Sequence, residues 1–203
     1  WGAASSSHQV EGGNFNDWTE WEKQNCQKLP LQQEKRCSSQ TKLTFPKETE
    51  EIIKDPQNYI SGPACDHYHR FEEDFNLAKN LNHNCHRFSI EWSRIEPKEN
   101  EFDQKEIEHY KKVVSSLKEK GMEPLVTLWH FALPLWVRNQ GGWENPKTSN
   151  DFCRYAEKIA QNLKDEVKEK LEHHIDKILL ISKPIDPSGR PTQSLDHEKI
   201  LLS

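Results

Sequence analysis

The sequence predicts an α/β fold in which helices alternate with parallel strands. Amphipathic stretches with helical spacing separate two strand-like stretches that begin about 40 residues apart, at Asn84 and Pro124. The second of these, residues 124–129, is almost entirely apolar, which is typical of a strand buried in a parallel sheet. Repeated strand–helix units build such a sheet because each helix carries the chain back to the start of the next strand.

The first strand is expected at the start of the sequence, where residues 1–12 open in small and apolar side chains. Residues 13–62 are polar and rich in Lys, Gln and Glu, with scattered Pro. Because this stretch has no sustained apolar face, we expect a loop-rich insertion with one short helix.

Three longer helices are expected beyond residue 65, each with one apolar face. Asp66 is expected to cap the first, because a carboxylate accepts hydrogen bonds from the free N–H groups of a first turn. Gly121 is expected to end the second helix, and the third begins near Thr148. The three apolar faces comprise Tyr68, Phe71, Phe75 and Ala78, then Ile107, Tyr110, Val114 and Leu117, and finally Phe152, Ala156, Ile159 and Leu163.

The second strand is expected at residues 84–90, between the first two of these helices. The resulting order of strands and helices fits both a doubly wound sheet and a (β/α)8 barrel. A dinucleotide-binding fold and a P-loop are disfavoured, because no GxGxxG motif follows a strand and the chain holds only 8 glycines. We therefore favour the barrel.

The composition narrows the classes of function. Hydrophobic residues make up 33% of the 203 residues and charged residues 30%, with a net charge of −5. This mild acidity gives no reason to expect a nucleic-acid partner. No uncharged apolar run reaches the ~18 residues of a membrane span, so no membrane partner is expected. No secretion signal is recognised either, and we expect a cytoplasmic protein.

The cysteines support the same compartment. Their number is odd and none forms a CxxC pair, so we expect reduced thiols. A bridge between Cys26 and Cys37 is the alternative that the spacing leaves open. The five are Cys26, Cys37, Cys65, Cys85 and Cys153.

Ten histidines raise the question of a metal site. Three groups have ligand-type residues close together in sequence, but none repeats a known zinc spacing. We therefore expect no metal and no cofactor. The groups are Asp66, His67 and His69, then His83 and His86, and then His173 and His174.

A sugar site is one interpretation of the residues expected at the carboxyl ends of the strands, where barrel enzymes carry their functional groups. Planar polar groups bond neighbouring hydroxyls, and aromatic rings stack on the apolar side of a sugar. The alternative is that the tryptophans belong to the core and that Arg87 forms a structural pair. The residues concerned are Gln9, Glu11, Arg87, Glu91, Trp129, His130 and Phe131.

Over residues 1–163 the sequence resembles glycoside hydrolase family 1, the β-glucosidase and β-galactosidase family. The resemblance lies in six motifs that occur in the family's order. They are WGAASSSHQVEG (1–12), CDHYHR (65–70), RFSIEWSRI (87–95), EPLVTLWHFALP (123–134), GGWEN (141–145) and FCRYA (152–156). The resemblance implies the first three strand–helix units of a (β/α)8 barrel. It also implies an enzyme that hydrolyses β-linked glucosyl or galactosyl residues, with a small β-glycoside or oligosaccharide as its partner.

Four positions match residues with known roles in the family. Gln9 and His130 match residues that bond hydroxyls of the terminal sugar. Phe131 stands where Trp is usual, so the resemblance implies a smaller wall without an N–H donor. Arg87 matches the arginine that keeps the nucleophilic carboxylate ionised, an opposite-charge effect on the pKa.

The family's catalytic pair is not found among the 203 residues. Retaining glycosidases use two carboxylates ~5–5.5 Å apart, one as acid/base and one as nucleophile. The family carries them in an Asn-Glu-Pro and a Thr-Glu-Asn-Gly motif, and neither motif occurs in this sequence. Glu11 and Glu91 match scaffold or rim positions, so we expect no catalytic residue in this chain.

Residues 164–203 are expected to be a divergent tail, helical to about residue 180 and irregular beyond it. Three strands cannot close a barrel, so we expect self-association through open sheet edges. Two alternatives to an active glycosidase are an inactive fragment that keeps half of a sugar site and a truncated product without function.

Overall fold

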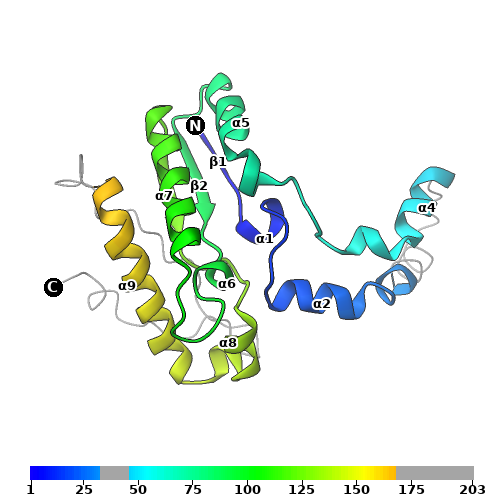
Figure 1. Cartoon of the computed structure of the whole chain (residues 1–203). Coiled ribbons are helices and arrows are strands. Elements are labelled where there is room, and N and C mark those ends of the chain that lie inside the picture. Colours follow the sequence, from blue (N-terminus) through cyan, green and yellow to red (C-terminus); the bar gives the residue numbers. More distant parts are fainter. Residues whose placement is uncertain (33–45, 168–203) are drawn as a thin grey trace.

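Three short strands form one parallel sheet in the computed structural model, which describes residues 1–32 and 46–167 (Figure 1). They are β1 (Gly2–Ala4), β2 (Cys85–Ser89) and β3 (Glu123–Thr127), in the order β1-β2-β3. Gly2 is paired with Cys85, and Cys85 with Glu123, so the strands run side by side in register. The predicted parallel sheet is confirmed, and its carboxyl ends meet at one edge.

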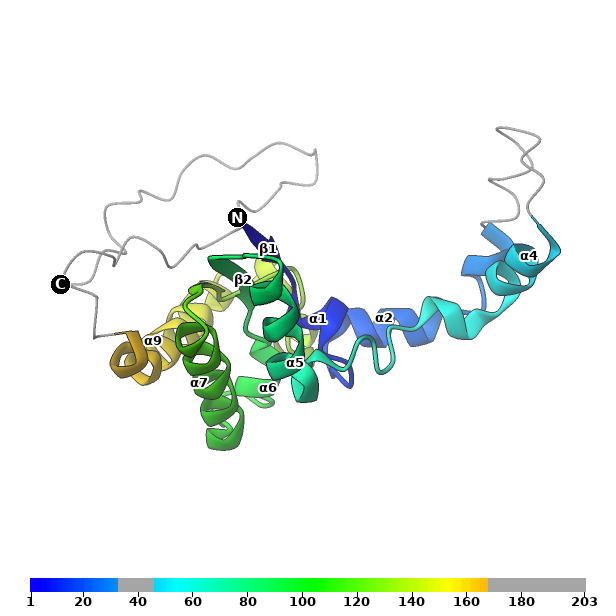
Figure 2. The ribbon, with the colours of Figure 1, turned by 90° about the horizontal axis from the view of Figure 1, so that it is seen from above.

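Three long helices cover one face of the sheet (Figure 2). Helix α5 (His67–Asn80) leads into β2, α7 (Gln104–Glu119) connects β2 to β3, and α9 (Lys147–Val167) follows β3. Every residue of the three predicted apolar faces is buried or half-buried. Apart from Tyr68, these faces pack with Phe88 and Ile90 into one hydrophobic core, so the periodicity predicted both the helices and their packing sides.

Strand β3 is less buried than its apolar sequence predicts. Pro124, Leu125 and Val126 are half-buried, and full burial begins at Thr127. The expectation of a fully buried strand at residues 124–129 is therefore wrong for its first half. Among the described residues, helices cover only one face of the sheet, and β3, like β1, is an edge strand.

The insertion at residues 13–62 is more helical than predicted. It holds α2 (Asp17–Asn25), α4 (Lys47–Lys54) and the 3-10 helix η1 (Pro56–Tyr59), which together extend away from the sheet as an arm (Figures 1 and 2). One short helix was expected there. The start of α2 has its own signal, because Asn16 and Thr19 exchange side-chain and backbone hydrogen bonds as a capping box.

The helix ends test three further expectations. Helix α5 begins after Asp66 as predicted, but no side-chain capping bond forms; the Asp66 carboxylate accepts from His69 Nδ1 at 2.7 Å instead. Gly121 ends α7 with φ +68°, a left-handed conformation that glycine adopts readily. Helix α9 starts one residue before Thr148, and its expected continuation to residue 180 lies outside the described residues.

Short helices that were not predicted follow the strands. These are α1 (Ser7–Val10), α6 (Trp92–Ile95), α8 (Leu135–Asn139) and η2 (Gly142–Glu144). Each is too brief to show a helical period in sequence, and each bends the chain at the carboxyl edge of the sheet.

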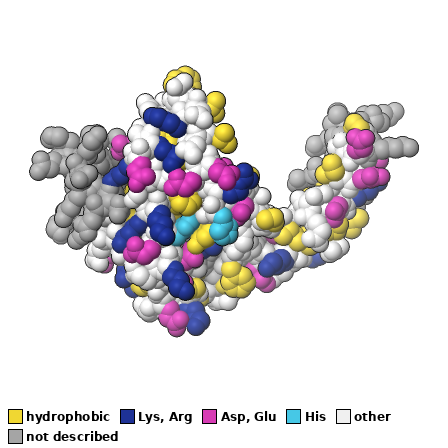
Figure 3. All heavy atoms as spheres, turned by 45° about the horizontal axis from the view of Figure 1, so that its top comes forward, with side chains coloured by type: hydrophobic (Ala, Val, Ile, Leu, Met, Phe, Trp, Pro, Cys, Tyr) yellow, Lys and Arg dark blue, Asp and Glu magenta, His cyan; other side chains and the backbone are white. Residues whose placement is uncertain are grey.

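Acidic and basic side chains are interspersed on the outer surface, as Figure 3 shows. Pairs such as Arg70 with Glu73 and Lys111 with Glu108 join residues three apart on single helices. These are solvated helix faces, and such exposed pairs contribute little stability. Among the described residues, no helix combines the length and the apolar character that crossing a membrane requires.

Candidate active site

Of the four residues predicted to bind sugar or support catalysis, Gln9, His130 and Phe131 follow strands at the carboxyl edge of the sheet, and Arg87 reaches this edge from the middle of β2. Gln9 is in α1, directly after β1, and Arg87 is in β2. His130 and Phe131 follow β3. In a (β/α)8 barrel this edge carries the functional groups, because the loops after the strands converge there.

Gln9 is exposed, and its amide is oriented by a neighbour. The buried Ser6 hydroxyl donates to Gln9 Oε1 at 2.8 Å. With the carbonyl oxygen engaged in this way, the Nε2 group is the end of the amide that can donate to a ligand.

The turn that carries Gln9 is anchored to β2 through Ser7. The Ser7 backbone N–H donates to Ser89 Oγ, and the Ser7 hydroxyl donates to Glu91 Oε2, both at 2.8 Å. Glu91 is only 1% exposed and also accepts from Ser93 Oγ at 2.7 Å. The Glu91 carboxylate therefore supports the loop after β1 from inside the protein.

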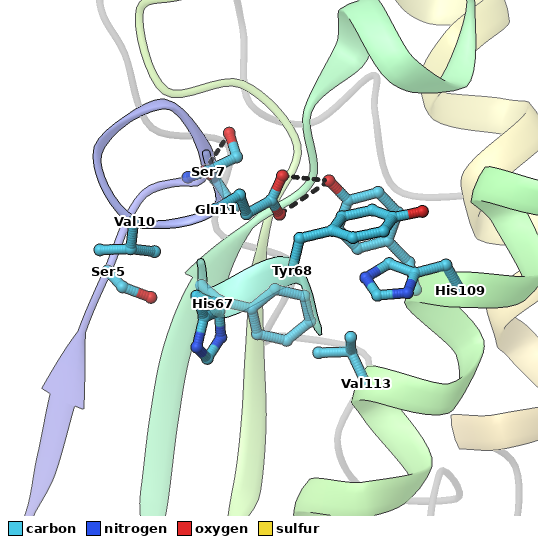
Figure 4. Close-up of a pocket in the computed structure, with 11 residues that line it drawn as sticks. Ser5, Ser7, Val10, Glu11, His67, Tyr68, His109 and Val113 are labelled. Atoms are coloured by element: carbon cyan, nitrogen blue, oxygen red, sulfur yellow. Dashed lines mark hydrogen bonds between the residues drawn. The ribbon is translucent and has the colours of Figure 1, made fainter. Parts of the chain in front are cut away.

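Glu11 ends the same turn in a second buried network. Its carboxylate accepts from the Tyr110 hydroxyl at 2.8 Å (Figure 4) and from Arg94 Nε at 3.1 Å. The Arg94 guanidinium also donates to Gly12 O at 2.6 Å and lies 4.3 Å from the centre of the Tyr68 ring. Burial raises the pKa of Glu11 to about 8, although Arg94 lowers it. Sequence reasoning did not identify this network.

A cavity of about 10 Å³ lies beside this network, between the sheet and helices α5 and α7 (Figure 4). It has room for about one water molecule and is therefore no sugar pocket. Its lining includes Glu11, His67, Tyr68, His109 and Tyr110.

Arg87 and His130 are coupled across β2 and β3. Arg87 Nε donates to Thr127 Oγ1 at 3.0 Å, which directs the guanidinium along β3. Burial lowers the pKa of His130, and the positive charge of Arg87 lowers it further. His130 is therefore neutral at neutral pH, so one ring nitrogen can donate and the other can accept.

Aromatic rings form a wall behind His130. Phe131 is 54% exposed, and its ring lies 6.0 Å from that of Trp129 and 5.1 Å from that of His130. Trp129 contacts Trp143 edge-on at 4.7 Å. The N–H groups of both indoles are buried, and neither has a hydrogen-bond partner among the described residues. The wall joins the loop after β3 to η2.

The predicted histidine groups have other contacts. His67 Nδ1 bonds to Asp74 at 2.6 Å, and the rings of His67 and His86 stack at 6.5 Å. No three His, Cys, Asp or Glu side chains in residues 1–32 and 46–167 lie close enough together to hold a metal ion. His173 and His174 lie outside the described residues.

Comparison with known proteins points to one family. The model of the family described as Glycosyl hydrolase family 1 matches residues 1–183. The match continues 20 residues past residue 163, where the resemblance was expected to end, and so includes part of the segment expected to be a divergent tail. Beta-glucosidase A of Acetivibrio thermocellus is 43% identical over 103 residues, covering 50% of this chain and 23% of that protein. Beta-glucosidase 40 of Arabidopsis thaliana is 45% identical over 107 residues, covering 52% and 21%. The chain thus spans about a quarter of the length of these relatives.

Solved structures show the same fold. A β-glycosidase from Pyrococcus horikoshii superposes with a TM-score of 0.63 at 35% identity, covering 81% of this chain and 32% of its own. The β-glycosidase BGL167 gives 0.61 at 38% identity, covering 81% and 33%. The three strand–helix units are thus part of a (β/α)8 barrel, and with the family model matched over residues 1–183 the chain belongs to glycosyl hydrolase family 1.

Proposed function

We propose that this chain forms the side of a β-glycosidase site that holds the terminal sugar, with a β-linked glucosyl or galactosyl residue as its ligand. The observation that carries the proposal is the position of Gln9, His130 and Phe131 directly after strands at one edge of the sheet, which the Arg87 guanidinium reaches through Thr127. An amide donor, a neutral imidazole and an exposed ring together supply hydroxyl contacts and a stacking surface.

Hydrolysis would follow the retaining two-carboxylate mechanism of the family. Arg87 would hold the nucleophilic carboxylate ionised by its positive charge. Neither catalytic motif occurs in these 203 residues, and both Glu11 and Glu91 are committed to internal hydrogen bonds. We therefore assign neither carboxylate a catalytic role and attribute no catalytic group to this chain. No cofactor enters the proposal.

The second candidate function is sugar binding without hydrolysis. It is favoured because neither catalytic motif occurs in these 203 residues. We expect castanospermine, with which a β-glucosidase from Thermotoga maritima has been solved, to raise the melting temperature of the chain. A chromogenic β-glucoside should bind without releasing its chromophore. Release of the chromophore would instead show that the chain supplies its own catalytic groups.

Substitution of the sugar-binding residues provides the specific test. Gln9→Ala and His130→Ala should each raise the dissociation constant for castanospermine about tenfold, the effect of about one lost hydrogen bond. The control is His69→Ala, because His69 is exposed on α5 and bonded to Asp66. If the unmutated chain binds neither castanospermine nor a β-glucoside, the site does not function and the interpretation as a product without function gains support.

Self-association is part of the same proposal. In the described part of the chain, β1 and β3 each pair on one side only, with β2. Unpaired strand edges recruit other strands. We expect light scattering to show a mass above 23.9 kDa that rises with protein concentration. Ala3→Lys, which places a charge on β1, should reduce this association, whereas Leu77→Lys on the exposed side of α5 should not. A monomer at all concentrations would contradict the proposal.

The cysteines support a cytoplasmic location. The structure has free thiols at Cys26, Cys65, Cys85 and Cys153. Cys37 lies outside the described residues, so the alternative bridge between Cys26 and Cys37 stays untested. Free thiols are typical of a reducing compartment.

A further inference from the structure

The turn that presents His130 and Phe131 is strained. Phe131 has φ +71°, a left-handed conformation that bulky side chains rarely adopt. The backbone N–H of Ala132 donates to His130 O at 3.0 Å and closes a three-residue γ-turn of the unfavourable kind. The Phe131 ring is more than half exposed, so packing of this ring does not explain how the turn is held. Another contact must hold it.

Asp17 makes that contact. The Leu133 backbone N–H donates to Asp17 Oδ1 at 2.7 Å, and the Asp17 backbone N–H donates to Leu133 O at 3.0 Å. Leu133 is two residues beyond Phe131 and is itself buried. These two hydrogen bonds fix the chain directly after the strained turn, and they come from the first residue of α2 in a different loop.

The other end of this connection leads toward Gln9. Asn16, which precedes Asp17 and is fully buried, is held by its capping box with Thr19. The Asn16 side-chain amide lies 3.3 Å from Nδ1 of His8, the neighbour of Gln9. Hydrogen bonds of the neighbouring residues Asn16 and Asp17 thus link the turn that carries Gln9 to the turn that carries His130.

We propose that Asp17 is a positioning residue that holds the strained turn at Phe131 and thereby sets His130 and Phe131 against the loop of Gln9. Asp17 touches none of the proposed ligand positions itself. Its effect on sugar binding rests on the function proposed above, whereas its effect on the turn does not. The two can therefore be tested separately.

The direct test follows the His130 ring by NMR during a pH titration. Burial and the charge of Arg87 lower the pKa of His130 in the folded chain. In Asp17→Ala the turn should relax and His130 should become more exposed, so its pKa should rise toward the ordinary value. Asp17→Asn keeps an oxygen that accepts from Leu133 N–H, and it should restore the low pKa. Castanospermine affinity should fall about tenfold in Asp17→Ala and recover in Asp17→Asn.

Asp103→Ala is the matched control. Asp103 also accepts a backbone N–H, from Lys105 at 2.8 Å, but it does so at the start of α7. An unchanged His130 pKa in Asp17→Ala, or an equal shift in Asp103→Ala, would overturn the proposal. If the unmutated chain binds no castanospermine, the proposed function fails and the His130 titration still decides the role of Asp17.

A measurement on the unmutated chain covers the case in which Asp17→Ala does not fold. The hydrogen bond to Asp17 should protect the Leu133 amide from hydrogen exchange as strongly as the amides of β3 are protected. Exchange at Leu133 as fast as in an open loop would overturn the proposal, because the contact would then not persist in solution.

Discussion

Replacing Arg94 with alanine should lower the free energy of unfolding by about 3 kcal/mol, because several buried acceptors lose their donor and each unsatisfied group costs about 1–3 kcal/mol. Arg94 Nε donates to Glu11 at 3.1 Å and to Asn14 at 3.0 Å, and the guanidinium also donates to Gly12 O. Alanine would leave these buried acceptors without their donor. Urea denaturation monitored by tryptophan fluorescence measures the change.

Arg70→Ala is the control for this prediction. Arg70 pairs with Glu73 on the exposed side of α5, so its removal should leave the unfolding midpoint unchanged. Arg94→Lys should recover only part of the loss, because an ammonium group cannot reproduce the planar fork that reaches several acceptors at once. An Arg94→Ala midpoint equal to that of Arg70→Ala would show that the network contributes no stability.

The strands and long helices could be predicted because each carries its signal within its own residues. Phe75, Val114 and Ile159 are buried at the positions that a helical period marks. Residues 84–90 and 124–129 are short stretches between the predicted helices, the second almost entirely apolar, and both contain strands. In all these cases burial of one side decides the structure, and burial leaves a periodic pattern.

The turns at the carboxyl edge could not be predicted in the same way. The left-handed Phe131 depends on Asp17, 114 residues earlier in the sequence, and no local pattern reports such a contact. At Asp66 the local pattern predicts a contact that does not form. The residue type suits a cap, yet its carboxylate bonds to His69 because its own backbone is left-handed. The capping box of Asn16 and Thr19 is the one local signal that could have revealed α2.

The sequence identified the residues of the candidate site, but it did not identify the residues that hold them in place. Gln9, Arg87, His130 and Phe131 were identified by their place at the expected ends of the strands, and their roles were then taken from the resemblance to a family. The residues that hold them in place, among them Glu91 and Arg94, lie inside the same motifs without any sign of their partners. Buried charged pairs depend on three-dimensional proximity, so only the structure shows which carboxylate meets which donor.

The stability of the chain should reach a maximum near pH 6.5 and fall by about 1 kcal/mol between pH 6.5 and 8. Burial raises the pKa of Glu11 from 4.5 to about 8. Between these values the unfolded chain has lost the Glu11 proton and the folded chain keeps it, so rising pH favours unfolding. Each pH unit in this range changes the free energy of unfolding by up to about 1.4 kcal/mol.

Two histidines cause the free energy of unfolding to decrease as the pH falls below 6.5. Burial lowers the pKa of His86 to about 4, aided by the charges of His67 and His83. Burial also lowers the pKa of His109 to about 4, aided by Arg94. Below pH 6.5 the unfolded chain binds two protons that the folded chain excludes, which outweighs the single proton of Glu11. Stability therefore rises with pH up to 6.5 and falls only above it.

The variant Glu11→Gln tests separately the fall in stability above pH 6.5. A glutamine has nearly the same shape, and its amide oxygen can still accept from Tyr110 and Arg94, but it does not ionise. The fall in stability between pH 6.5 and 8 should therefore disappear in this variant, while the acid side remains. Glu48→Gln, on the exposed surface of α4, should keep the full profile. If Glu11→Gln retains the alkaline fall, Arg94 and Tyr110 hold Glu11 as a carboxylate in the folded chain, and burial does not dominate its titration.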